Sequence, residues 1–232
     1  MAGMTAIVLH DLGSRREARS WFATAARAAA ESGGDQLHAW VLAREAMVPL
    51  NHGAPKADLA DQSRHAAGSR PTAAATLAAA VTARAYALNH QSEQARAALE
   101  AANARMARLP ESERSDTWLT YGEQKHHVHL SHAYTTLTDT RRARESQQRA
   151  PELSAPTSTL TRTPLHIDAA ACAHHDGDSE QACRRTITAL NGLPDGYRTG
   201  LVRRRAQDLY EAIPAQHHHE RAVQELRNVL VA

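Results

Sequence analysis

An alanine recurs at the same position in successive predicted helix pairs of this chain. The intervals between its occurrences are 39, 38, 48 and 39 residues, and each occurrence follows a short polar turn: Ala18, Ala57, Ala95, Ala143 and Ala182. A second alanine follows seven residues later in four of the pairs: Ala25, Ala102, Ala150 and Ala189. Two helices approach closely only where no bulky side chain stands between them, so this spacing is typical of stacked helical hairpins. It predicts an all-α solenoid.

Turn signals divide the 232 residues into five hairpins and a closing helix pair. A polar insert over 110–116 accounts for the longest interval. Pro151 is expected to end one helix, and Thr163 with Pro164 to begin the next. We therefore expect a single domain over 1–232, with hairpins at about 4–32, 36–68, 72–109, 118–153 and 163–193 and closing helices over 200–231.

Composition narrows the functional classes. Aromatic residues make up 4% of the chain, so the core must be built from Ala, Leu and Val, which favours close helix packing. The net charge of +2 is too small to indicate nucleic-acid binding by itself. No segment approaches the ~18 apolar residues of a membrane span, and the start lacks the pattern of a signal peptide. Two cysteines do not form a disulfide framework, so we expect a cytoplasmic protein.

The hairpin phase resembles the tetratricopeptide repeat. Tyr86 and Tyr134 lie nine residues before the recurring alanine of the third and fourth hairpins. Phe22 lies four residues after that alanine in the first hairpin, and Pro194 lies twelve residues after it in the fifth. The resemblance implies a tetratricopeptide-like α-solenoid whose first helices line a concave groove. The usual interval of 34 residues is shorter than those found here, so the repeat is divergent.

Longer segments resemble the C-terminal region of actinobacterial helix-turn-helix transcriptional regulators. The segments that carry this resemblance are 11–13, 17–21, 39–41, 44–46, 139–143 and 222–227. The resemblance implies a sensor or regulatory module without catalytic activity. No helix-turn-helix is found before the repeats, so we expect no direct binding of nucleic acid by this chain.

The predicted concave surface combines cations, histidines and small apolar residues. Such a surface suits a peptide, a protein segment or a small signal molecule, with a carboxylate bound by Arg84 or Lys125. Trp118 and Tyr121 either form a wall of this groove or pack the insert against the third hairpin. The predicted groove residues are Arg84, Lys125, His129, His132, Ile167, His174, Trp118 and Tyr121.

Three other functions compete with groove binding. His126, His129 and His132 share one face of a predicted helix and can supply ligands to a metal-responsive regulator if another helix provides a further one. A homodimerisation scaffold is the second alternative. An enzyme would need a histidine–carboxylate pair such as His166 and Asp168, which helical geometry places on different faces. We expect no catalytic residues, no bound metal and no cofactor.

The remaining clusters favour structural roles. Cys172 and Cys183 flank a turn, and we interpret them as small apolar residues of a tight hairpin. The alternative is a redox pair. The histidine run 217–219 reads as an exposed linker. We interpret the arginine clusters as solvated helix faces rather than phosphate contacts; they lie at 141–144, 184–185 and 203–205.

Overall fold

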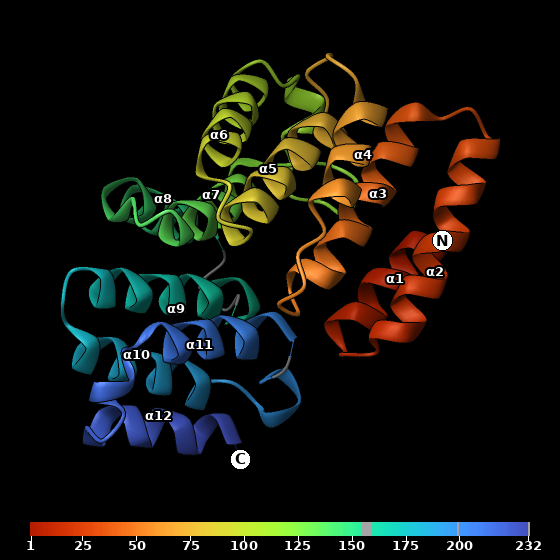
Figure 1. The fold of residues 1–232 in the computed structure, drawn as a ribbon. Helices are drawn as coiled ribbons and strands as arrows, with labels where there is room; N and C mark the ends of the chain where they lie inside the picture. The colour runs from red at the N-terminus through yellow and green to blue at the C-terminus, as the bar shows by residue number, and fades with distance from the viewer. Residues whose placement is uncertain (155–158, 199, 232) are drawn as a thin grey trace.

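The fold consists of paired helices stacked side by side (Figure 1). The computed structural model describes residues 1–154, 159–198 and 200–231, including all side chains in these ranges except those of residues 159 and 160. These residues form helices and turns and no strand. The α-helices are α1 (Ala2–Asp11), α2 (Arg15–Glu31), α3 (Asp35–Leu50), α4 (Ala57–Ala67), α5 (Ala73–Leu88), α6 (Ser92–Ala107), α7 (Glu123–Thr136), α8 (Thr140–Glu152), α9 (Thr159–His175), α10 (Ser179–Asn191), α11 (Gly200–Ala212) and α12 (Arg221–Val231).

Each odd-numbered helix packs against the even-numbered helix that follows it. The odd-numbered helices α3, α5, α7, α9 and α11 also contact one another in sequence, so they form one continuous layer. Three core clusters of buried apolar residues follow this layer from the first pair to the last. The expected all-helical class is therefore confirmed, and every predicted hairpin is present as a helix pair.

The repeated alanine occupies the fourth position of each second helix. Ala18, Ala95, Ala143 and Ala182 are all 0% exposed there, because the adjoining helix passes directly over them. The predicted position is wrong in the second pair. Helix α4 begins at Ala57, and it is Ala60 that is fourth in the helix and 0% exposed. The second alanine of that pair is accordingly Ala67, seven residues on and also buried.

Two predicted helix ends shift by a few residues. Pro151 lies in the last turn of α8 instead of ending it, and the helix continues to Glu152. Helix α9 begins at Thr159 rather than at Pro164, which lies inside it. Each proline lacks an N–H group, so its helix lacks the hydrogen bond to the residue four positions before it, yet both helices continue through that position.

The insert between the third and fourth pairs caps a helix. It contains a short 3₁₀ helix, η1 (Glu111–Glu113), and an exposed segment that carries Trp118. The carboxylate oxygen Oδ1 of Asp116 accepts hydrogen bonds from the backbone N–H groups of Gly122, at 3.2 Å, and of Lys125, at 3.3 Å. These are free N–H groups at the start of α7, so the insert fixes where that helix begins.

The last helix pair returns to the turn that follows α3. A Cβ atom added at Gly53 would lie 2.8 Å from Nε of Arg204 in α11, and one added at Gly200 would lie 3.6 Å from the ring of His52. Both glycines have positive φ angles, of 75° and 53°. The first half of α11 therefore lies against the turn that follows α3.

Candidate ligand-binding site

A cavity of about 520 Å³ lies between α5, α7, α9, α11 and the turn after α3. We call it the first cavity. Apolar side chains of α9 and α11 form part of its wall, among them Ile167, Ala171 and Leu209. Exposed residues such as His90 and His175 form its rim. Its size falls within the usual range for small-molecule sites. Polar groups from five parts of the chain line it: Asn51, Arg84, His132, Asp168 and Arg205.

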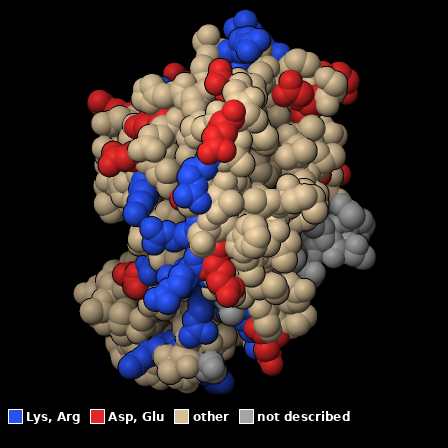
Figure 2. Space-filling view, turned by 90° about the vertical axis from the view of Figure 1, so that its right-hand side faces the viewer, with Lys and Arg blue, Asp and Glu red and all other residues tan. Residues whose placement is uncertain are grey.

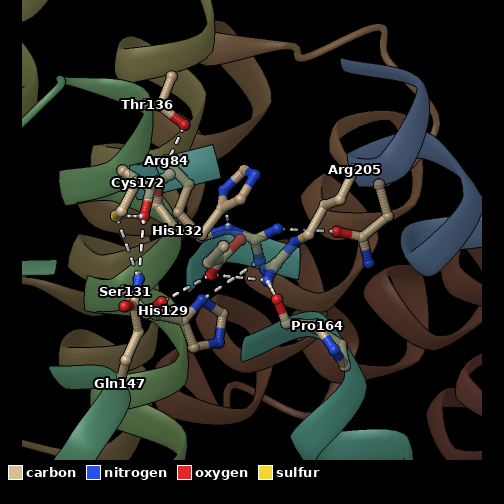
Figure 3. A network of polar contacts seen from close by, with 12 residues as sticks. Arg84, His129, Ser131, His132, Thr136, Gln147, Pro164, Cys172 and Arg205 are labelled. Atoms are coloured by element: carbon tan, nitrogen blue, oxygen red, sulfur yellow. Dashed lines mark hydrogen bonds and ion pairs between the residues drawn. The ribbon is translucent and has the colours of Figure 1, made fainter. Parts of the chain in front are cut away.

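Arg84 projects from α5 into the middle of this region (Figure 3). It is 2% exposed. Its Nε donates to Nδ1 of His132 at 3.1 Å, its Nη2 donates to Oδ1 of Asn51 at 3.0 Å, and its Nη1 lies 3.4 Å from Nδ1 of His129. All three partners are neutral acceptors. In the described part of the chain no carboxylate oxygen lies within 4 Å of this guanidinium.

Arg205 enters the same region from α11 (Figure 3). Its Nη1 donates to the carboxylate of Asp168 at 2.8 Å and to the backbone oxygen of Pro164 at 3.1 Å. Ser131 donates to the same Asp168 oxygen at 2.6 Å. Thus one buried ion pair, supported by a hydroxyl group, joins α7, α9 and α11.

The enclosed groups carry more positive than negative charge. Two guanidinium groups, of Arg84 and Arg205, lie near one carboxylate, that of Asp168, which forms an ion pair with Arg205. Burial and, after it, the charge of Arg205 lower the pKa of Arg84 to about 9, while Asp168 opposes the change. Burial also lowers the pKa of Arg205 and raises that of Asp168. A buried charge without a counter-ion is costly, so this cluster is suited to receive an anion.

The histidines of α7 remain neutral. His126, His129 and His132 are all buried. Burial lowers the pKa of His126 to about 4, and burial followed by the nearby arginines lowers the pKa values of His129 and His132 well below 6.5. As neutral rings they can accept hydrogen bonds from Arg84 without adding charge.

A second cavity, of about 450 Å³, adjoins the first. Both are lined by Asn51 and Leu201. The second cavity is also lined by Arg44, whose guanidinium lies 5.2 Å from the ring centre of Trp40, and by Lys125. Burial lowers the pKa of Lys125 to about 8. Cationic groups therefore line both cavities.

Six of the eight predicted groove residues line one of these two cavities. Arg84, His132, Ile167 and His174 line the first, and Lys125 and Trp118 line the second. His129 and Tyr121 are buried beside them, with their ring centres 6.0 Å apart. Tyr121 belongs to the core cluster that includes α5 and α6, while Trp118 is 46% exposed. The insert thus contributes both a core residue and a cavity wall.

Sequence reasoning missed three residues of the site. They are Asn51, Asp168, which the sequence offers only as a partner of His166, and Arg205, which the sequence places in an exposed arginine cluster. A signal for Arg205 is present in the sequence, because Val202, Arg205 and Leu209 recur at helical spacing on one face. The structure buries all three. Asn51 and Asp168 offer no comparable signal.

The other predicted clusters do not form sites. No group of three or more metal-ligating side chains occurs among the residues that the structure describes. His126 instead lies 2.9 Å from the Asn103 side-chain oxygen. His166 is exposed whereas Asp168 is buried, so that pair does not meet. Cys172 and Cys183 are buried free thiols in different core clusters.

A wider hollow lies outside this network. It measures about 1370 Å³ and lies between α2 and α4. The charged residues on its walls include Arg16, Arg19, Lys56 and Asp58, all of which are exposed. Solvated side chains of mixed charge bind ligands weakly, so we favour the first cavity as the site.

Two further findings bear on the type of protein. No described helix combines the length and the apolar character needed to cross a membrane. No family model matches the chain, and no curated protein or solved structure matches it either.

Proposed function

We propose that this chain is a non-catalytic, tetratricopeptide-like binding module that holds a peptide end or a small signal molecule in the first cavity. Its role would be that of the sensor part of a transcriptional regulator. The regulatory role rests on the sequence resemblance, and the binding role rests on the site.

The enclosed charge cluster is the observation that carries this function. A stack of helices needs only apolar contacts to be stable, and buried ionic groups seldom add stability compared with apolar residues of similar size. Here Arg84, Asp168 and Arg205 come from three different helices and gather at one cavity. Ligand sites typically combine an apolar wall with a few convergent polar groups, and the first cavity has both.

The arrangement also suggests how binding could be transmitted. Arg205 is the ion-pair partner of Asp168 and belongs to α11, which also lines the first cavity. A ligand that binds one position of α11 better than another would shift the population towards that position. Because stacked pairs contact mainly their neighbours, such a shift would propagate along the array.

Native mass spectrometry of protein purified gently from its own host tests the binding function. A bound mass that leaves after mild denaturation would support it and would give the class of the ligand. Protein that is free of bound mass, and that acquires none from a fractionated extract of that host, would contradict it.

Self-association is a second candidate, supported by α1. Met4, Val8 and Leu12 recur at helical spacing and are 36%, 48% and 66% exposed, so one side of the first pair presents apolar surface. Light scattering after gel filtration over a range of concentrations tests it. A dimer mass that Val8→Glu reduces to the monomer mass would support it, and a monomer at all concentrations would contradict it.

A further inference from the structure

Arg84 is the starting point. It is a buried guanidinium whose hydrogen bonds go to two histidines and an asparagine. Removing a charged group from water is expensive unless an opposite charge or a metal compensates it. Its neutral partners satisfy its donors but leave its charge without a counter-ion.

Arg205 supplies the second observation. It is 4% exposed. Its Nη1 is used by Asp168 and Pro164, but Nε and Nη2 are buried without a hydrogen-bond partner among the described residues. An unmade hydrogen bond from a buried charged donor costs free energy, so such donors normally have a partner.

The two guanidinium groups also lie close to each other. Figure 3 shows the side chains of Arg84 and Arg205 converging between the helices. Their mutual repulsion contributes to the lowered pKa of Arg84. A carboxylate or phosphate between two arginines would neutralise both and could accept several N–H groups at once.

The cavity restricts the size and shape of the ligand. It offers about 520 Å³, and its lining includes apolar side chains as well as the charged groups. This volume suits a small organic molecule better than a helix or a folded partner. Figure 2 shows Lys and Arg side chains, with Asp and Glu side chains among them, on one face of the molecule.

We propose that the first cavity binds a small organic anion whose carboxylate or phosphate group lies between Arg84 and the free donors of Arg205. The inference rests on the proposed binding function and names the chemical class of its ligand. The apolar wall formed by Ile167, Ala171 and Leu209 would hold the rest of the molecule.

Thermal unfolding of the whole chain tests the inference with inorganic phosphate, acetate and succinate, each compared with sodium chloride at equal ionic strength. We expect a saturable rise of the melting temperature with at least one of these anions. A response to phosphate alone indicates a phosphate-bearing ligand, and a response to the carboxylates alone indicates an organic acid. Arg84→Gln should abolish the response, Arg84→Lys should retain part of it, and the exposed control Arg141→Gln should leave it unchanged.

A measurement on the wild-type protein keeps the test valid if the Arg84 variants fail to fold. The Nε–H signals of Arg84 and Arg205 in a nuclear magnetic resonance titration should shift with the active anion, whereas the signal of Arg141 should not. Absence of any response, or an equal response in Arg84→Gln and Arg141→Gln, would overturn the inference. If a neutral ligand is found in the cavity and Arg84→Gln still binds it, this inference fails while the binding function stands.

Discussion

Arg205 and Asp168 form a buried ion pair that joins α11 to α9. The Nη1 to Oδ2 distance is 2.8 Å, and both side chains are 3% exposed. The pair joins two helices that both line the first cavity, and Nε and Nη2 of Arg205 are buried without a hydrogen-bond partner among the described residues. Its integrity should therefore affect both stability and binding.

We predict that Asp168→Asn destabilises the fold by about 3–5 kcal/mol, because it leaves a buried guanidinium without its charged partner. Urea unfolding measures this loss, and the exposed pair of Glu145 with Arg141 provides the control through Glu145→Gln, which should change little. The double variant Asp168→Leu with Arg205→Met should recover much of the stability. If that double variant is less stable than Asp168→Asn alone, the account of the pair is wrong.

The lowered histidine pKa values predict a loss of stability in acid. The pKa of His126 is about 4 in the folded protein, against 6.5 when unperturbed. The unfolded chain therefore binds a proton that the folded chain resists, so the stability is retained above pH 6.5 and is lost as the pH falls towards 4. At pH 5 the loss from this residue is about 2 kcal/mol. The pKa values of His129 and His132 are shifted in the same direction.

The measurement compares urea unfolding at pH 7.5 and pH 5 in the wild type and in His126→Gln. The variant should lose less stability on acidification than the wild type does. His166→Gln is the control, because that side chain is exposed and its removal should leave the dependence as it is. Equal losses in the wild type and His126→Gln would contradict the assignment of a neutral buried ring.

Gly122 is predicted to be required for the start of α7. A Cβ atom there would lie 2.6 Å from the backbone oxygen of Arg114 and would also overlap the Asp116 carboxylate. Gly122→Ala should therefore destabilise the protein by about 1–3 kcal/mol and release the cap. Gly196→Ala serves as the control, since a Cβ atom there has nothing within 4 Å. Thermal unfolding of both variants tests this prediction. Equal melting temperatures would show that the insert accommodates a Cβ atom at Gly122 without loss of stability.

The position of the repeat can be tested by adding bulk. Ala60 is 0% exposed beneath the adjoining helix, whereas Ala57 is the partly exposed first residue of α4. Ala60→Leu should cost about 1–3 kcal/mol through overpacking, and Ala57→Leu should cost less. If Ala57→Leu lowers the free energy of unfolding in urea more than Ala60→Leu does, then Ala60 is not the buried repeat position of α4.

Most of the fold follows from local rules in the sequence. Small residues such as Ala95 and Ala143 predicted the close helix contacts, and the turn residues predicted where the pairs divide. The second pair was misplaced because Ala57 and Ala60 both fit the spacing, and only burial distinguishes them. The helix ends near Pro151 and Pro164 were predicted from the rule that proline lies outside helix interiors, whereas both prolines lie inside α8 and α9.

The site was less predictable, because it depends on contacts between residues far apart in the chain. The phase of α5 and α7 placed Arg84 and His132 on the inner side, and both line the first cavity. The return of α11 to the turn at Asn51 has no local signature. Consequently the sequence predicted a groove lined by the first helices of the pairs, whereas in the structure α11, predicted only as one of the closing helices, also lines the cavity that holds Arg84 and His132.

The most direct test of the central claim compares native mass spectra of the wild type and Arg84→Gln, purified in parallel from the same host. Circular dichroism of both proteins confirms that they are equally helical. We predict a bound anionic molecule in the wild type that is absent from Arg84→Gln and is present in the exposed control Arg141→Gln. An empty wild-type protein, or the same bound mass in all three, would contradict a ligand site built on Arg84.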